Sequence, residues 1–471
     1  MTENPARSVD LEISTDDLYR QIRSESPLLI FDLRLKEEFQ KGHIEGSSHA
    51  VCDARAKETI MPKIPKNVKI VLVDGDGSMS AQTTQMMRSM GFDVHYLKGG
   101  IKSWNKGLVK SAQHTMVSAD DVWKNLQGND LFLLDVREPD EFSDFRISGS
   151  VNIPLKDLFN QDTISKIPKD KKIVTICPHG NRAMIAAFAL IRNGIPAQVL
   201  LGGLASWNQF LNPTQVSDDP IIIQIEKVGK GCLSYIAVSG RTAVVIDPLY
   251  PAEKYQEIAK SRGFTITTII DTHQHADHVS AARDLAAISG AKFFESGLEV
   301  WDLEANLLKD GDIVTFGQSN IHVMHTPGHT PGSLSYLLDE KYVFTGDTLF
   351  VESVGRPDLR DKAAEFAMHL YDSLHNKLLN LPPQVVILPA HHGEAVKPQN
   401  GIYWTTVEKA KTHPVLTLSK DDFVREIEKI TLPRPMNYRK IIDINKGSVP
   451  LDKNEIPDLE IGPNRCSIIA T

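Results

Sequence analysis

We expect a multidomain α/β protein, with two small parallel-sheet domains followed by a larger metal-binding domain. Three observations predict this. The chain has 471 residues, more than the roughly 250 to 300 residues at which single hydrophobic cores stop growing. Its first half contains an internal repeat in which short apolar runs alternate with helix-like stretches, which is typical of parallel sheets covered by helices. Its second half carries a dense cluster of histidines.

The repeat is defined by two pairs of matching segments. Residues 29–34 (LIFDLR) match 132–137 (FLLDVR) at an offset of 103 residues, 135 minus 32. Residues 98–105 (KGGIKSWN) match 201–208 (LGGLASWN) at the same offset, 202 minus 99. Because the offset is constant, the two copies align without a net gap between these points.

Two stretches indicate where the domains end. We place the first boundary within residues 107–114 and interpret the polar stretch 212–220 as a linker. The sequence therefore predicts domains at residues 1–110, 111–215 and 216–471.

Composition and charge limit the classes of function. Sixty acidic residues outnumber 52 basic ones and no basic block stands out, which disfavours nucleic acid and anionic membranes as partners. We find no apolar run near the ~18 residues of a membrane span, and the first residues lack the pattern of a secretory signal. The four cysteines are far apart without a Cys-x-x-Cys, which favours free thiols in a reducing compartment. We expect a cytoplasmic protein that acts on small molecules.

The chemistry of the second copy is concentrated in residues 177–182 (CPHGNR). This segment follows an apolar run at 172–176 and precedes a helix-like stretch at 183–192. Backbone N–H groups of such a loop, the positive end of the following helix and Arg182 would favour a thiolate at Cys177 and hold an anion bound to it. We predict that Cys177 and Arg182 are catalytic.

These features resemble the rhodanese family, and the resemblance spans both copies. It rests on the Cys-x-x-Gly-x-Arg loop, residues 135–137 (DVR), residues 149–154 (GSVNIP), and Gly202–Gly203 with Trp207. It implies that the cysteine takes a sulfane sulfur from thiosulfate or another donor, becomes a persulfide and passes the sulfur to an acceptor thiol. Related phosphatases use a loop one residue longer, so the shorter loop favours sulfur over phosphate.

The first copy lacks these chemical groups. The offset aligns Asp74 with Cys177 and Met79 with Arg182. A carboxylate cannot carry sulfane sulfur, so we expect this copy to be catalytically silent. Cys52 aligns outside the active loop, and we interpret it, like Cys232, as a small apolar residue.

Residues 272–278 (THQHADH) offer three imidazoles and a carboxylate within seven positions. The preceding residues 267–271 have the pattern of a strand, and imidazole is the commonest neutral metal ligand. Further ligand types, at His329, Asp347 and His391, each follow a short apolar segment, as loops at the edge of a sheet would. We therefore predict a metal site.

This pattern resembles the metallo-β-lactamase superfamily over roughly the last half of the chain. The resemblance implies an αβ/βα sandwich with the metal at one edge between two sheets. One option that these ligand positions allow is a site that binds two zinc ions and activates a water molecule between them. The first ion would be held by His273, His275, His329 and Asp347, and the second by Asp277, His278, His391 and a bridging Asp347.

A single ferrous ion is the other option. His273, His329 and Asp347 would then form a two-His, one-carboxylate face, which suits a non-haem Fe(II) oxygenase. In that case the remaining residues of the cluster would orient the ligands and move protons. These residues are His275, Asp277, His278 and His391.

Two further stretches look like the persulfide dioxygenases. They are residues 348–359 (TLFVESVGRPDL) and the tail at 413–423 (HPVLTLSKDDF) with 432–435 (LPRP). The resemblance implies oxidation of a thiol persulfide by O2 to sulfite and free thiol, with Arg356 helping to bind the thiol. Glutathione-specific members usually have Asp-Tyr where this chain has His392-Gly393, so glutathione, bacillithiol, coenzyme A and other thiols stay open.

We therefore expect an enzyme of sulfide or thiosulfate metabolism that joins a silent rhodanese, an active rhodanese and a persulfide dioxygenase. It would bind one Fe(II) per chain, with Zn(II) as the alternative, and would use a thiol persulfide, O2 and a sulfane sulfur donor. A homo-oligomer is compatible with the sequence. One rival reading is a dizinc thioester hydrolase of the hydroxyacylglutathione hydrolase (glyoxalase II) type. Another is a sulfur carrier based on Cys177.

Overall fold

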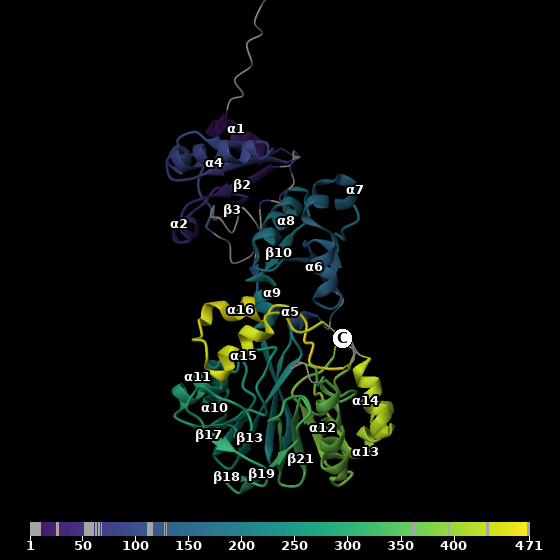
Figure 1. The fold of residues 1–471 in the computed structure, drawn as a ribbon. Coiled ribbons are helices and arrows are strands. Elements are labelled where there is room, and N and C mark those ends of the chain that lie inside the picture. The colour runs from purple at the N-terminus through teal and green to yellow at the C-terminus, as the bar shows by residue number, and fades with distance from the viewer. Residues whose placement is uncertain are drawn as a thin grey trace, which may run out of the picture. The chain divides into compact units, whose positions relative to one another are not determined.

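The structure is a computed structural model. It describes residues 11–468 except 25–27, 51–60, 62–63, 65, 67, 111–115, 127, 129, 359–362, 394 and 430–432. The chain forms two compact units, Met1–Trp207 and Asn208–Thr471, shown in Figure 1. The first contains two five-stranded sheets, and the second contains a seven-stranded and a six-stranded sheet. The predicted α/β fold class is confirmed.

The first copy of the repeat is a parallel sheet with the order β1-β5-β4-β2-β3. All five residues of β2 are buried, as expected of a central strand covered on both faces. Its strands are β1 (Glu12–Ile13), β2 (Leu28–Asp32), β3 (Ser47–His49), β4 (Lys69–Val73) and β5 (Val94–Leu97), and its α-helices are α1 (Thr15–Ile22), α2 (Lys36–Lys41) and α4 (Ser78–Ser89).

The second copy has the same topology, with the order β6-β10-β9-β7-β8 and parallel pairing throughout. Its strands are β6 (Met116–Val117), β7 (Leu131–Asp135), β8 (Val151–Asn152), β9 (Lys172–Ile176) and β10 (Ala197–Leu200). Its α-helices are α5 (Ala119–Asn125), α6 (Pro139–Asp144), α7 (Gln161–Ile164), α8 (Asn181–Arg192) and α9 (Gly203–Asn208). The equal sheet orders agree with the repeat found in the sequence.

The repeated Gly-Gly pair lies against the loop that follows β4 in the first copy and β9 in the second. Leu204 donates its N–H to the carbonyl of Cys177 at 2.9 Å, and Ile101 donates to the carbonyl of Asp74 at 2.8 Å. Gly203 has φ +62°, and a Cβ there would lie 2.2 Å from the Cys177 oxygen. Glycine is required at this position because any side chain would push the cysteine loop away.

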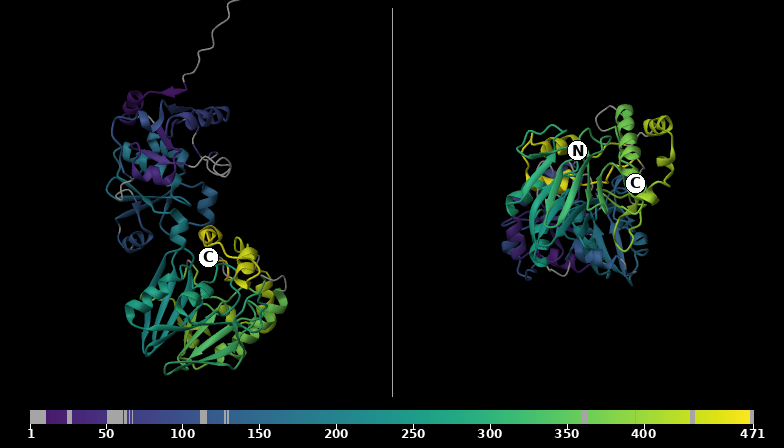
Figure 2. Two further views of the ribbon diagram at one scale, coloured as in Figure 1. Left: turned by 90° about the vertical axis from the view of Figure 1, so that its left-hand side faces the viewer. Right: turned by 90° about the horizontal axis from the view of Figure 1, so that it is seen from below.

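The second unit is a sandwich of two sheets, which Figure 2 shows from two further sides. The first sheet runs β11 to β17 in chain order, antiparallel up to β14 and parallel from there. Its strands are β11 (Leu211–Asp218), β12 (Ile221–Lys227), β13 (Cys232–Ser239), β14 (Thr242–Ile246), β15 (Thr265–Ile270), β16 (Lys292–Ser296) and β17 (Asn306–Leu308).

The second sheet runs β18 to β23, also in chain order, and β21 and β22 are its parallel pair. Its strands are β18 (Ile313–Phe316), β19 (Ser319–His325), β20 (Leu334–Leu338), β21 (Tyr342–Gly346), β22 (Val386–Pro389) and β23 (Thr405–Thr406). The helices of this unit are α10 (Glu253–Arg262), α11 (Ala282–Ser289), α12 (Ala363–Asn376), α13 (Val407–Ala410), α14 (Lys420–Glu428), α15 (Tyr438–Lys446) and α16 (Ile456–Leu459).

Three hydrophobic clusters make the αβ/βα layers. The inner cluster joins the facing sides of the two sheets, for example Ile222 with Phe344. The opposite side of the first sheet packs on α10, α11 and α15, and the outer side of the second packs on α12 and α14. Neighbouring residues Ile222 and Ile223 of β12 belong to different clusters, because successive side chains of a strand point to opposite faces.

The stretch interpreted as a linker, residues 212–220, is mostly a strand. β11 pairs along its length with β12 and forms the edge of the first sheet. An edge strand with a solvent-facing side can be polar and can contain a proline such as Pro213. The composition of β11 is therefore similar to that of a linker. The division into three domains remains our proposal.

Among the described residues, no helix combines the length and the apolar character that crossing a membrane would need.

The glycine contact gives a test of the rhodanese-like fold. We expect Gly203→Ala to lower the stability of the first unit by at least about 2 kcal/mol more than Gly194→Ala. Gly194 has φ +71° but open space around its Cβ position, so it controls for backbone strain alone. Thermal unfolding of both variants checks this, and equal midpoints would contradict the steric argument.

Candidate functional site

Four loops bring the predicted metal-binding side chains to one edge of the sandwich. Residues 272–278 follow β15, His329 lies between β19 and β20, Asp347 follows β21 and His391 lies two residues after β22. All the predicted ligands are buried: His273, His275, Asp277, His278, His329, Asp347 and His391.

Three of these side chains converge on one point. The Nε2 atoms of His273 and His329 lie 3.7 Å and 3.4 Å from Oδ2 of Asp347, and all three atoms are within 4.8 Å of one another. None of the three has a hydrogen-bond partner among the described residues. Buried polar atoms without partners are rare and costly, so their convergence marks a place for a ligand.

The opposite side of each ring fixes its tautomer. Nδ1 of His329 lies 2.9 Å from the carbonyl oxygen of Arg356, which can only accept. Nδ1 of His273 lies 2.9 Å from Oγ1 of Thr272, whose own proton is donated to Asp247. Both Nδ1 atoms therefore carry the proton and both Nε2 atoms present lone pairs. Burial holds the pKa of His273 and of His329 below the ordinary histidine value, which keeps both rings neutral.

Asp347 is held from its other oxygen by His391. Nδ1 of His391 donates to Oδ1 of Asp347 at 2.5 Å, and Nε2 donates to Oδ2 of Asp277 at 2.8 Å. Burial opposes the charged ring, but the Asp347 and Asp277 carboxylates outweigh it and raise the pKa of His391 well above its ordinary value. With both nitrogens engaged, His391 orients Asp347 and offers no lone pair to a metal.

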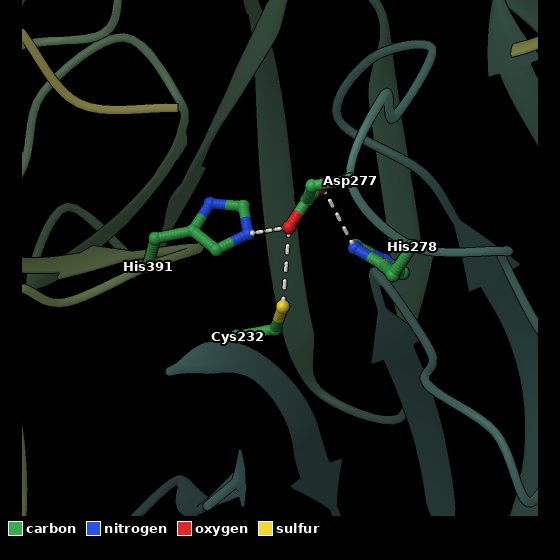
Figure 3. Close-up of side chains that lie close together, drawn as sticks. All are labelled: Cys232, Asp277, His278 and His391. Atoms are coloured by element: carbon green, nitrogen blue, oxygen red, sulfur yellow. Dashed lines mark hydrogen bonds and ion pairs between the residues drawn. The ribbon is translucent and has the colours of Figure 1, made fainter. Parts of the chain in front are cut away.

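A second cluster surrounds Asp277, as Figure 3 shows. Its carboxylate also accepts a bond from Nδ1 of His278 at 3.1 Å and one from the thiol of Cys232 at 3.2 Å. Burial raises the pKa of Cys232 to about 12, so the thiol is protonated. Cys232 was interpreted as a plain apolar residue; that was wrong, because the start of β13 places it beside His391 through an antiparallel bridge.

The ring of His275 lies 4.2 Å from that of His273, and its Nδ1 has no hydrogen-bond partner among the described residues. Its Nε2 lies 3.2 Å from Oδ1 of Asp247, and it groups with Asp247 and Asp271. Burial lowers the pKa of His275, but the carboxylates of Asp247 and Asp271 outweigh this effect and raise the pKa to about 9. A dizinc arrangement would need this side chain as a ligand.

The C-terminal tail supplies further residues that sequence patterns did not reveal. The thiol of Cys466 groups with Asp347 and His391. Asn445 accepts the N–H of Ser280 and donates to the carbonyls of His275 and His278. Glu460 accepts the N–H of Val279 at 2.8 Å and pairs with buried Lys227. These contacts fix the histidine loop from behind. No local motif marks residues so distant in sequence.

Arg356, which the resemblance implies would help to bind the thiol, is buried and bonded within the second unit. Its guanidinium bonds the carboxylate of Asp358 and the carbonyls of Pro433 and Arg465, and its side chain is 2% exposed. Its own carbonyl orients His329. Arg356 therefore holds the tail and orients His329, and its contact with the thiol stays a prediction.

These residues fit a metal ion. Two neutral imidazole nitrogens and one carboxylate oxygen converge without other partners among the described residues. In the group around Asp277, the thiol of Cys232 and the ring of His391 bond the carboxylate, and Nε2 of His278 has no described partner. His273, His329 and Asp347 would therefore hold a metal ion at their convergent atoms.

A cavity of about 60 Å³ lies beside this centre. His391 forms part of its wall, together with Phe350, Val351 and Val396. The ring of Phe350 lies 6.1 Å from that of His391. The cavity therefore reaches the centre through His391, which bonds Asp347.

In the first unit, Cys177 lies in the predicted loop between β9 and α8. Its Sγ accepts N–H groups from Gly180 at 3.1 Å and Ala183 at 3.3 Å. Burial raises the pKa of the thiol; the loop amides and Arg182 favour the thiolate, as expected, but they offset the effect of burial only in part. Arg182 is buried, and its guanidinium makes a bidentate ion pair with the carboxylate of Glu141, both distances 2.8 Å. The negative charge of Glu141 therefore largely neutralises the positive charge of Arg182.

In the first copy, the carboxylate of Asp74 fills the loop that follows β4. The carboxylate of Asp74 accepts N–H groups from Gly77 at 2.5 Å, Met79 at 2.7 Å and Ser80 at 3.1 Å, and the Ser80 hydroxyl at 3.0 Å. It therefore occupies the place that Cys177 has in the second copy. Cys52 lies outside the described residues.

Comparisons with known proteins find two families in this chain. The family model described as "Metallo-beta-lactamase superfamily" matches residues 228–391, and "Rhodanese-like domain" matches residues 14–107 and 118–210. The chain is 34% identical over 237 residues to "Persulfide dioxygenase ETHE1, mitochondrial" of Bos taurus, covering 49% of this chain and 89% of that protein.

The chain belongs to the metallo-beta-lactamase superfamily. Its second unit is homologous to persulfide dioxygenases, and two rhodanese-like domains precede it. It is also 32% identical over 206 residues to a hydroxyacylglutathione hydrolase of Brucella anthropi, covering 43% of this chain and 75% of that protein. A crystal structure of ETHE1 from Myxococcus xanthus matches with 29% identity and a TM-score of 0.43, covering 50% of this chain and 99% of that chain.

The convergent atoms of the metallo-beta-lactamase unit predict one metal per chain. We expect His329→Ala to weaken metal binding by more than about ten-fold, because it removes a direct ligand. His278→Ala is the control, since His278 belongs to the group around Asp277, and it should leave the metal content unchanged. Metal analysis of both purified variants checks this. Two metals in the unchanged protein, with one lost in His278→Ala, would contradict it.

The filled loop predicts a structural role for Asp74. Asp74→Ala leaves several buried donors without an acceptor, so we expect a loss of roughly 2–4 kcal/mol in the stability of the first unit. Sulfur transfer per folded molecule should not change. Asp76→Ala, at an exposed carboxylate of the same loop, should have a much smaller effect on stability. Denaturant unfolding and a sulfurtransferase assay test both points, and loss of transfer in folded Asp74→Ala would contradict them.

Proposed function

We propose that this protein oxidises a low-molecular-weight thiol persulfide with O2, and that its second rhodanese-like domain supplies the persulfide from thiosulfate or another sulfane sulfur donor. The metal is one ferrous ion at His273, His329 and Asp347. The observation that carries this proposal is the set of three unpartnered ligand atoms, in a unit homologous to persulfide dioxygenases.

The proposed reaction balances as RSSH + O2 + H2O giving RSH + sulfite + 2H⁺. The outer sulfur is oxidised by four electrons, which reduce O2, and its bond to the inner sulfur breaks. Two-His, one-carboxylate sites with open positions are typical of Fe(II) oxygenases. A ferrous ion there would supply the redox chemistry through which O2 reacts with sulfur.

The surrounding residues have distinct roles in this proposal. His391 holds a proton on Nδ1 against Asp347 and so keeps the other carboxylate oxygen directed at the metal position. Thr272 and the Arg356 carbonyl fix the two imidazoles in the ligand tautomer. Phe350, Val351 and Val396 line the cavity with apolar surface, which limits water beside a reactive persulfide.

Sulfur transfer is proposed for Cys177. Thiosulfate or another donor would pass its sulfane sulfur to the thiolate, releasing sulfite in the case of thiosulfate, and an acceptor thiol would then take the sulfur as RSSH. The N–H groups of Gly180 and Ala183 would stabilise the anionic sulfur. Because burial raises the pKa of Cys177, this step should become faster as the pH rises.

A dizinc thioester hydrolase is the second candidate. The likeness to a hydroxyacylglutathione hydrolase favours it, and Asp277, His278 and His391 lie where a second ion would need ligands. Against it, both ring nitrogens of His391 are bonded to carboxylates.

Two variants separate the proposed steps. Cys177→Ser should abolish O2 consumption driven by thiosulfate plus thiol, while sparing O2 consumption driven by preformed persulfide. His329→Ala should stop both O2 reactions yet leave sulfur transfer to an acceptor thiol. An oxygen electrode and a sulfite assay follow these reactions. If Cys177→Ser kept the thiosulfate-driven rate, the coupling would be untenable.

A further inference from the structure

The cavity beside the metal centre carries information about the substrate. It is joined to the centre through His391, which donates to Asp347 at 2.5 Å. Its wall continues through Phe350, Val351 and Glu352, the residues that follow the Asp347 loop. A substrate whose sulfur approaches the metal position would therefore leave its organic part in this cavity or at its mouth.

The size of the cavity limits what enters. A volume of about 60 Å³ compares with the roughly 10–15 Å³ that one water needs by the same kind of measure. This is room for a persulfide group and a short aliphatic stem. A larger thiol, such as a tripeptide, would keep its polar groups at the mouth.

The charged residue that lines the cavity is acidic. Glu352 lines it and is exposed, and no lysine or arginine is among the described residues of its wall. His392 also lines it, but this ring already pairs with Glu226 at 3.1 Å and stacks on Tyr403.

One more titratable group lies beside Glu352. Burial lowers the pKa of His413 despite this neighbouring carboxylate, so the imidazole is neutral near pH 7. The negative charge of Glu352 is therefore not compensated by His413.

We propose that this cavity selects persulfides whose organic part is uncharged or carries an ammonium group over persulfides whose organic part carries carboxylates. The inference rests on the proposed function and names the substrate class of the same site. Glu352 is the residue that would set this preference. A substrate carboxylate at the mouth would meet Glu352 without a cation of the wall to pair with, whereas an ammonium group would pair with it.

The test compares three preformed persulfides with the iron-loaded, full-length protein: cysteamine persulfide (cationic), 2-mercaptoethanol persulfide (neutral) and glutathione persulfide (carboxylate-bearing). We expect kcat/KM for O2 uptake to fall in that order. Glu352→Gln should lower the ratio of the cysteamine value to the glutathione value by roughly three- to ten-fold, the scale of one or two exposed charge contacts.

The matched control is Glu304→Gln, which removes an exposed carboxylate of the same unit that is not in the wall of the cavity. It should leave the ratio unchanged. Added salt should reduce the ratio in the unchanged protein, because exposed charges are screened.

The outcomes separate the two proposals. O2 uptake that is fastest with glutathione persulfide, or a ratio unaffected by Glu352→Gln, would overturn the selectivity and leave the proposed function standing. No O2 uptake with any of the three persulfides would overturn the proposed function, and this inference with it.

Discussion

The proposed metal centre depends on three buried atoms that have no hydrogen-bond partner among the described residues. Each such atom costs roughly 1–3 kcal/mol when it stays unsatisfied, so the second unit must hold Nε2 of His273, Nε2 of His329 and Oδ2 of Asp347 in place by other bonds. It does so from behind: Thr272, the Arg356 carbonyl and His391 bond the opposite side of each ligand. A bound metal would repay this cost, and the protein without metal should be less stable.

The fold explains how these bonds are made. The loops that follow β15, β21 and β22 meet at one edge of the sandwich, and the tail closes over them through Asn445 and Glu460. In the first unit the same strand-loop-helix setting appears twice with opposite outcomes. Asp74 accepts the N–H groups of its own loop with a carboxylate, while Cys177 places a thiol sulfur at the same position.

Much of this organisation could be predicted from the sequence because its signals are local. The repeat, the cysteine loop and the histidine cluster each lie within a few residues, and the ligands His329 and Asp347 occupy recognisable motifs. The sequence did not reveal four further residues of the site, because only the folded chain brings them there. These are Cys232, Asn445, Glu460 and Cys466. The polar edge strand β11 was read as a linker, and the effect of burial on the pKa of Cys177 was not foreseen, since neither partner strands nor burial can be read from local composition.

The stoichiometry of the persulfide reaction tests the central claim most directly. Iron-loaded protein would be mixed with a preformed persulfide in a closed oxygen-electrode cell, and O2, sulfite and free thiol would be measured together. We expect one O2 to be consumed and one thiol to be released for each sulfite formed, and we expect removal of the metal to abolish all three changes. Thioester hydrolysis by the same preparation, with no persulfide-dependent O2 uptake, would contradict it.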